Sequence, residues 1–259
     1  MLAIERHNYI LKLLADNGLV TTNELCELLD VSPATVRNDL NKLEKDRLIH
    51  KTHGGATLLS STIQKSQNNY PFSERENKNK REKEAISNAA LKHIEENQCI
   101  ILDASSTALA VARKLDRFSR LTVVTNGIYT MLALKDMPNI TVIFIGGIVT
   151  KNSGSIEGLL GYDLLNHINA DTAFISSHAF TLLEGLADFN IYEAELKKQM
   201  LSHSRSCIAL LDYTKLEHIS IANYCPTKDI DYLITDEQIA PELLTRYKNN
   251  GIKIEVATL

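Results

Sequence analysis

A short polar turn after an apolar run is the first segment of this sequence whose residue types could bind a ligand. The run CIIL, residues 99–102, is followed by Asp103, Ser105, Ser106 and Thr107 as the apolar spacing of a helix begins. In an open α/β sheet, such a turn lies at the carboxyl end of a strand, where small molecules usually bind. Hydroxyl and backbone N–H groups at a helix N-terminus suit a phosphate. Serine and threonine also cap helices for purely structural reasons, so this turn alone leaves both interpretations open.

Similar chemistry recurs at the ends of other expected strands. The further loops contain Thr125, Asn126 and Gly127, then Gly146 and Gly147, then the DYTK segment at 212–215. Lys215, which follows an acidic and hydroxyl-bearing turn, could pair with a phosphate as a point charge. Ordinary turns and a surface lysine are the alternative. Several polar or glycine-containing strand ends together favour a shared ligand site.

DNA recognition is indicated in a different segment, VSPATVRNDLNKLEK at residues 31–45. A serine N-cap and a proline predict a helix start, and Val36, Leu40 and Leu43 fit one buried face. On the other face, Arg can pair with guanine, Asn with adenine, and Ser or Thr with phosphate. The candidate DNA contacts are Ser32, Ala34, Thr35, Arg37, Asn38, Lys42, Lys51 and His53. A merely solvated polar face is equally consistent with the spacing alone.

The elements around this segment predict a winged helix-turn-helix. Apolar residues at helical spacing indicate one helix that ends at Gly18 and a second that Thr21 or Thr22 caps. Residues 48–51 and 56–59, separated by a glycine turn, read as a hairpin wing. Three helices and a two-stranded wing are the parts that place a recognition helix in the major groove.

Apolar and helical segments alternate through the rest of the chain, which predicts a doubly wound, mostly parallel α/β sheet. Strands are expected at residues 99–103, 121–125, 140–145, 172–176, 206–211, 230–235 and 252–256. Helices are expected at residues 107–115, 128–135, 160–169, 192–203 and 237–249. The expected domains are a winged helix-turn-helix at 1–59, a linker at 60–79 and an α/β effector-sensing domain at 80–259.

Length and composition exclude several classes of protein. A chain of 259 residues suits two domains, and a net charge of −4 argues against a nonspecific architectural DNA binder. The cysteines at 26, 99, 207 and 225 form no zinc pattern and no disulfide framework. No apolar run reaches the roughly 18–20 residues that cross a bilayer, and the first residues do not resemble a signal peptide. We expect a cytoplasmic protein without a metal or cofactor.

The order of these motifs resembles the DeoR family of bacterial transcriptional regulators. Residues 4–57 match the family's N-terminal domain through RHNYILKLL, ELCELLDVSPATVRNDLNKLEK and KTHGGA. Residues 80–257 match its C-terminal sensor domain through DASST, VVTNG, FIGG, DTAFIS, EAELKKQM and LLDYTKL. The resemblance implies a sensor domain similar in fold to ribose-5-phosphate isomerase. It also implies a homo-oligomeric regulator, mostly a repressor of a sugar-catabolism operon, whose partners are operator DNA and a phosphorylated sugar.

Effector-binding positions follow from the resemblance. Those carried over are Asp103, Ser105, Ser106, Thr107, Thr125, Asn126, Gly147 and Lys215, with Asp188, Glu193 and Lys197 completing the pocket. The chain departs from the family at Asn38, where a second basic residue is frequent. It also departs after TAFIS, where His178 and its neighbours replace a small, glycine-bearing segment. His178 is either a pH-sensitive ligand contact or a structural histidine.

A sugar-phosphate isomerase is the main alternative function. Glu193 or Asp188 could act as the base, and Lys215 could stabilise developing oxyanion charge. A DNA-binding domain gives such an enzyme no evident advantage. We therefore expect a regulator without catalytic residues.

Overall fold

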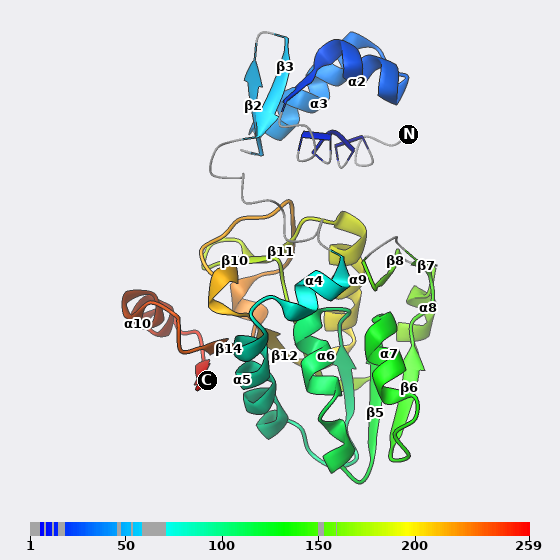
Figure 1. The fold of residues 1–259 in the computed structure, drawn as a ribbon, viewed down its shortest axis with the longest axis vertical. Coiled ribbons are helices and arrows are strands. Elements are labelled where there is room, and N and C mark those ends of the chain that lie inside the picture. The colour runs from blue at the N-terminus through cyan, green and yellow to red at the C-terminus, as the bar shows by residue number, and fades with distance from the viewer. Residues whose placement is uncertain are drawn as a thin grey trace. The chain divides into compact units, whose positions relative to one another are not determined.

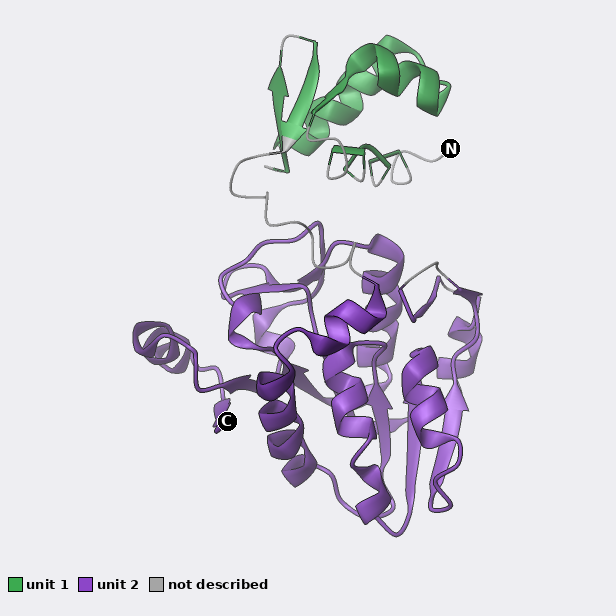
Figure 2. Cartoon of the chain, viewed as in Figure 1, with its two compact units in different colours: residues 1–69 green, residues 70–259 purple. Residues whose placement is uncertain are grey.

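The computed structural model describes residues 6–7, 9–11, 13–14, 19–45, 48–52, 54–58, 71–149, 153–158 and 160–259. The chain divides into two units, Met1–Asn69 and Tyr70–Leu259, which Figure 2 shows in green and purple. Each unit is a separate body with its own interior, and each is described by itself.

The first unit consists of helices and a small antiparallel sheet. Its described residues between 6 and 14 are helical, followed by α2 (Thr22–Leu29) and α3 (Pro33–Lys45). The strands β1 (Leu19–Thr21), β2 (Ile49–Thr52) and β3 (Gly55–Leu58) pair in the order β1-β3-β2. The predicted wing thus has a third strand, which the sequence did not reveal because a three-residue strand is too short to show alternation.

Local chemistry explains where α2 and α3 begin and end. The Thr21 hydroxyl accepts a hydrogen bond from the Glu24 N–H at 3.2 Å, and the Thr21 N–H donates to the Glu24 carboxylate at 2.8 Å. This reciprocal pair is a capping box. Asp30, with a left-handed φ of 50°, ends α2. The Ser32 hydroxyl then accepts from the Thr35 N–H at 3.2 Å and starts α3.

A seven-stranded sheet forms the centre of the second unit, and every pairing in it is parallel. The strand order is β15-β14-β12-β9-β4-β5-β6. The strands are β4 (Cys99–Leu102), β5 (Leu121–Thr125), β6 (Ile140–Phe144), β9 (Ala170–Ile175), β12 (Ser204–Leu210), β14 (Tyr232–Asp236) and β15 (Ile254–Ala257). All seven predicted strands are confirmed, with small shifts at their ends.

Helices cover both faces of this sheet. The helices α5 (Lys80–Ala90), α6 (Ser106–Ala112) and α7 (Ile128–Leu134) pack on one face (Figure 1). The helices α8 (Tyr162–Leu165), α9 (Ile191–Ser202) and α10 (Pro241–Asn249) supply apolar residues to the other face. Successive strand residues alternate between the two interiors, since Ile100 belongs to the first and Ile101 to the second. Helix α8 is shorter than the predicted helix at 160–169.

Several elements of the second unit differ from the sequence prediction. The short helix α4 (Phe72–Asn77) lies where a linker was expected. It forms because the Phe72 side chain is buried and stacks on Tyr129 with ring centroids 4.2 Å apart. An antiparallel sheet of β10 (Ala179–Thr181), β11 (Gly185–Asp188) and β13 (Ala222–Cys225) was also not predicted. The pair β7 (Ile148–Val149) and β8 (Ile156–Glu157) is a further addition.

The strand order reverses between β4 and β9. From β4 the chain runs outward through β5 to β6, then returns to β9 on the other side of β4 and continues outward through β12. The loops after β4 and β9 therefore diverge at their carboxyl ends. Crevices at such a switch point are where open α/β sheets usually bind ligands.

Candidate DNA-contact face and effector site

The exposed side of α3 carries most of the predicted DNA contacts. Ala34, Arg37, Asn38 and Lys42 are exposed, whereas the apolar residues of the helix are buried. The hydroxyls of Ser32 and Thr35 lie 2.9 Å apart at the start of the helix, so both also belong to its cap. The Lys51 ammonium donates to the Asn41 side chain, which attaches this part of the wing to α3. His53 lies outside the described residues.

One acidic residue of α3 is turned inward. Asp39 is buried, and its carboxylate accepts hydrogen bonds from Arg6 Nε at 2.7 Å and Arg6 Nη2 at 3.2 Å. His7 Nε2 lies 2.8 Å from the same carboxylate. The negative charge of Asp39 is therefore paired inside the unit rather than presented beside Arg37 and Asn38. This arrangement was not evident from helical spacing, because Arg6 is distant in sequence.

In the second unit, a buried lysine holds the centre of a charged cluster. Lys197 Nζ lies 2.7 Å from Asp188 Oδ2, 3.1 Å from Asp103 Oδ2 and 3.5 Å from Glu193 Oε1. It also donates to the Ser176 carbonyl oxygen at 2.8 Å. Four predicted effector-binding residues, Asp103, Asp188, Glu193 and Lys197, are thus brought into contact, although they come from β4, β11 and α9 or their ends.

Burial and charge act in opposite directions within this cluster. Burial by itself would lower the pKa of Lys197, but Asp188 and Asp103 raise it well above its ordinary value. Burial raises the pKa of Glu193 to about 7, and the positive charge of Lys197 opposes that rise. Lys197 is therefore held as a cation, while Glu193 titrates near neutral pH.

Asp103 joins the two strands at the switch point. It is fully buried, and its carboxylate accepts from the Ser105 N–H and from the Ser176 N–H, both at 3.1 Å. The Ser105 hydroxyl accepts from the Ala108 N–H at 3.0 Å and caps α6. Asp103 and Ser105 therefore fix the shape of the DASST turn. Thr107 is buried in the first turn of α6.

Four cations gather close to the same strand ends, and we call Arg75, Lys78, Lys83 and Lys215 the cation cluster. Lys83 Nζ donates to the carbonyl oxygens of Arg75 and Lys78, the latter at 2.6 Å. The Ser106 hydroxyl donates to the Arg75 carbonyl oxygen at 3.3 Å, which places α4 against the DASST turn. Asn79 Nδ2 donates to Asp212 Oδ1 at 3.0 Å, which attaches the same segment to the DYTK turn.

Two lysines of the cation cluster, Lys83 and Lys215, are destabilised as cations. Burial lowers the pKa of Lys83 to about 8; Asp212 opposes this shift, and the charges of Lys215, Arg75 and Lys78 reinforce it. Burial also lowers the pKa of Lys215, with Lys78 and Arg75 adding to the effect. An anion bound here would relieve this repulsion. Of the four, only Lys215 is predicted from the sequence, and Arg75 and Lys78 lie in the expected linker at 60–79.

Further predicted positions are Thr125 and Asn126, at the end of β5, and Gly147, which stands directly before β7 and beside β8. Thr125 Oγ1 accepts from the Gly127 N–H at 3.0 Å, and Asn126 Nδ2 donates to the Ile156 carbonyl oxygen at 2.9 Å. A Cβ at Gly147 would stand 2.8 Å from the Glu157 carbonyl oxygen, so a side chain there would displace β8. Neither of these two hydrogen bonds involves Lys197.

Polar atoms without a partner are found at the same edge of the sheet. Among the described residues, the buried side-chain atoms that lack a hydrogen-bond partner are Arg75 Nε, Asn126 Oδ1, His178 Nδ1 and Thr235 Oγ1. Asn126, His178 and Thr235 stand at or just after the carboxyl ends of β5, β9 and β14. Buried polar atoms in folded proteins are nearly always paired, so these atoms mark groups available to a ligand.

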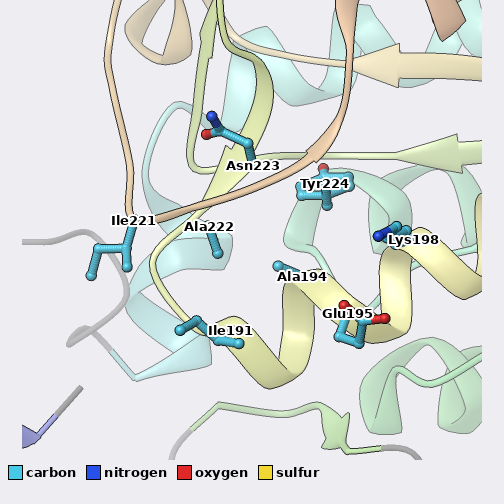
Figure 3. Close-up of a pocket in the computed structure, with 8 residues that line it drawn as sticks. All are labelled: Ile191, Ala194, Glu195, Lys198, Ile221, Ala222, Asn223 and Tyr224. Atoms are coloured by element: carbon cyan, nitrogen blue, oxygen red, sulfur yellow. The ribbon is translucent and has the colours of Figure 1, made fainter. Parts of the chain in front are cut away.

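A pocket of about 230 Å³ opens between α9 and β13 (Figure 3). Its lining residues are Ile191, Ala194, Glu195, Lys198, Ile221, Ala222, Asn223 and Tyr224. None of the predicted effector-binding residues is among them. Tyr224 connects the pocket to the charged cluster, because its hydroxyl donates to the Ser176 carbonyl oxygen at 3.2 Å and Lys197 Nζ lies 5.6 Å from its ring centroid.

Metal binding and membrane crossing find no support in the described part of the chain. No group of three His, Cys, Asp or Glu side chains is arranged there to hold a metal ion. None of the described helices combines the length and the apolar character needed to span a bilayer.

Comparison with known proteins supplies the family. Residues 6–62 match the DeoR-like helix-turn-helix domain, and residues 78–237 match the DeoR C-terminal sensor domain. The HTH-type transcriptional regulator GolR of Listeria innocua is 49% identical over 257 residues, which cover 99% of this chain and 100% of GolR. The chain belongs to the DeoR family. It is a DNA-binding transcriptional regulator with a sensor domain for a small-molecule effector, not an enzyme.

Other DeoR-family relatives cover the chain to a similar extent. The HTH-type transcriptional repressor CsqR of Escherichia coli is 30% identical, over 96% of this chain and 94% of CsqR. The glycerol-3-phosphate regulon repressor of the same organism is 28% identical, over 97% of this chain and 98% of that protein. Among solved structures, ribose-5-phosphate isomerase A of Methanocaldococcus jannaschii matches with 15% identity and a TM-score of 0.40, over 53% of this chain and 55% of the isomerase.

Proposed function

We propose that this DeoR-family regulator is a repressor of a sugar-catabolism operon and that a phosphorylated sugar or polyol controls it. The observation that carries the proposal is the cation cluster, which gathers four basic residues at the carboxyl ends of parallel strands. A phosphate carries up to two negative charges and several acceptor oxygens, so it both neutralises and orders such a group. A relative named as a glycerol-3-phosphate regulon repressor supports the same class of effector.

The proposed effector site combines two kinds of residue. Phosphate contacts come from the cation cluster with the DASST turn, and hydroxyl contacts come from polar residues at neighbouring strand ends. The predicted set of Asp103, Ser105, Ser106, Thr107, Thr125, Asn126, Gly147, Asp188, Glu193, Lys197 and Lys215 remains part of the proposal, with Arg75, Lys78 and Lys83 added. Asp103 acts there through the shape of the turn, because its carboxylate is already occupied by backbone N–H groups.

The proposed DNA contacts are the residues predicted from the sequence on α3, just before it and in the wing segment. Arg37 and Asn38 read bases, while Ser32, Ala34, Thr35, Lys42, Lys51 and His53 position the helix on the backbone. The DNA-binding domain ends near residue 59, and the sensor domain begins with α4 rather than at residue 80. A homo-oligomer presents two such domains to paired half-sites, which raises affinity by linking the two contacts.

Control by the effector requires two arrangements of the protein with different affinities for it. A phosphorylated sugar that binds the DNA-free arrangement more tightly lowers the population that binds the operator. Helix α4 is suited to report on the site, since it carries Arg75 and is the first element after the described residues of the DNA-binding unit.

The proposal is tested by gel-shift of the full-length protein on DNA from upstream of its own gene, with a panel of three- to six-carbon sugar phosphates and polyol phosphates. We expect a specific complex that at least one phosphate ester releases, while the corresponding unphosphorylated compound does not. Lys215→Ala should keep the complex and lose its release. Lys248→Ala, which removes an exposed lysine of the same unit, is the control and should behave as wild type. A specific complex that no phosphate ester changes would contradict the proposed effector class.

A further inference from the structure

His178 occupies the junction between the central sheet and the small antiparallel sheet. It stands after β9 and immediately before β10. Its backbone N–H donates to Asp188 Oδ1 at 2.9 Å, and the other oxygen of that carboxylate lies 2.7 Å from Lys197 Nζ. The position of His178 is therefore fixed by the same carboxylate that holds the charged cluster together.

The imidazole ring has an environment that a structural histidine would not need. Its Nδ1 is buried and has no hydrogen-bond partner among the described residues. The ring of Phe189 lies beside it, at a centroid distance of 5.9 Å and an interplanar angle of 60°, and supplies packing without a hydrogen bond. A buried polar atom left unpaired destabilises the folded protein, because its hydrogen bonds to water are lost and not replaced. A histidine retained only for packing could be replaced by an apolar residue without that cost.

Charge and burial keep this ring neutral. Burial lowers the pKa of His178 to about 4; Lys215 adds to the shift, Asp188 opposes it, and His218 and Lys197 lower it further. At neutral pH the ring thus offers one N–H donor and one nitrogen acceptor. A hydroxyl group can pair with Nδ1 in either tautomer, because a hydroxyl both donates and accepts. Because the ring is neutral, the part of the ligand that contacts His178 can also be uncharged.

We propose that His178 determines the specificity of the effector site by pairing its Nδ1 with a hydroxyl group of a phosphorylated polyol or sugar. The phosphate of that compound lies at the cation cluster, so this inference rests on the proposed function. His178 and Lys215 follow the carboxyl ends of β9 and β12, which are neighbouring parallel strands, so one small ligand can reach both. His178 then discriminates among phosphate esters by their hydroxyl groups, while the cations bind the feature that those esters share.

The test uses variants of the full-length protein that distinguish the packing of the His178 ring from the hydrogen bond of its Nδ1. His178→Phe keeps the ring and removes Nδ1, His178→Ala removes both, and His178→Asn retains a polar atom near the position of Nδ1. His167→Ala, which removes an exposed histidine of the same unit, is the matched control. Isothermal titration calorimetry measures binding of inorganic phosphate, glycerol-3-phosphate, ribose-5-phosphate and a wider set of three- to six-carbon sugar phosphates. Specific DNA binding and Tm confirm that each variant is folded.

We expect the wild type to bind at least one phosphate ester more tightly than inorganic phosphate. His178→Phe and His178→Ala should lower the affinity for that ester by about tenfold, since one hydrogen bond to a buried neutral group is lost. Their affinity for inorganic phosphate should stay within about twofold of the wild type. His178→Asn should recover most of the difference. If both apolar variants keep the full preference for the ester, the inference is wrong and the proposed function stands. If no ester binds the wild type more tightly than inorganic phosphate, both are wrong.

Discussion

The guanidinium of Arg6 lies 2.7 Å from the carboxylate of Asp39, although 33 residues separate them. Asp39 is in the middle of α3, on the side that faces the interior of the first unit, and His7 contacts the same carboxylate. The N-terminal segment thus holds α3 through these contacts with Asp39. The helix is held from behind while Arg37 and Asn38 stay exposed on its other side.

Removing this attachment should loosen the recognition helix without touching the proposed DNA contacts. We expect Asp39→Asn to lower the Tm of the first unit by several degrees and to weaken specific DNA binding, because Arg6 and His7 lose their anionic partner. Hydrogen–deuterium exchange of the full-length protein measures the protection of α3 directly. Asp30→Asn, at the exposed end of α2, is the control, since asparagine also tolerates its left-handed backbone. Unchanged protection of α3 in Asp39→Asn would show that the ion pair has no structural role.

Arg37 should contribute to sequence-specific binding. A bidentate contact from Arg to a base is worth about 1–3 kcal/mol of discrimination, so Arg37→Ala should weaken the specific complex by roughly 5- to 150-fold. Lys42→Ala should instead reduce the salt dependence of binding, as expected for a phosphate contact. Fluorescence anisotropy with specific and scrambled DNA separates the two effects. Lys228→Ala, an exposed lysine of the second unit, should change neither. Equal losses on specific and scrambled DNA in Arg37→Ala would assign Arg37 to the backbone.

Arg75 should couple the effector site to DNA release. Its Nε is buried without a hydrogen-bond partner. Arg75→Gln removes the proposed charge-assisted hydrogen bond from Arg75 to the phosphate ester, which is worth about 1.5–3 kcal/mol. We expect the concentration of phosphate ester that releases DNA to rise at least tenfold, while effector-free DNA affinity stays within about twofold. Gel-shift titration measures both quantities. Arg81→Gln, an exposed arginine on α5, is the control. A wild-type response in Arg75→Gln would remove Arg75 from the site.

Anion binding should depend on pH through Lys83. The pKa of Lys83 is lowered by burial to about 8, so the free site loses this positive charge as the pH rises through 8. Between pH 10.5 and 8 the unfolded chain binds more protons at this lysine than the folded protein does. The free energy of unfolding is therefore highest above pH 10.5 and falls as the pH is lowered through 8. A bound anion stabilises the charged form of Lys83 and so raises its pKa, and above pH 8 Lys83 takes up a proton when the anion binds. The affinity for the anion therefore falls as the pH rises above 8, by up to about tenfold per pH unit.

Calorimetry of inorganic phosphate binding between pH 7 and 10 tests this linkage, with two buffers of different ionisation enthalpy to count protons. Lys83→Arg should bind phosphate with a weaker dependence on pH, because arginine stays protonated throughout this range. Lys92→Arg, at an exposed lysine, is the control and should follow the wild type. Identical pH profiles for wild type and Lys83→Arg would place the anion away from Lys83.

Sequence periodicity was informative wherever an element is defined by its own neighbours. The buried face of α3 and the seven strands of the central sheet follow directly from apolar spacing, which burial imposes on each strand and helix separately. The DASST turn was predicted at a strand end for the same reason. Strand β1 and the sheet of β10, β11 and β13 were missed because short strands carry too few residues to show a period.

The sequence by itself determined that the chain joins a recognition helix to a parallel α/β sheet, since caps, apolar spacing and motif order are local and are read along the chain. The tertiary structure decided which charges meet. It paired Arg6 with Asp39, gathered three carboxylates around Lys197, and brought Arg75 and Lys83 to the strand ends beside Lys215. These contacts join residues far apart in the sequence, and a charged side chain looks the same in a linear pattern whether it faces water or a buried partner. Its environment, and with it its pKa and its proposed role, exists only after the strands have ordered themselves around the β4–β9 switch point.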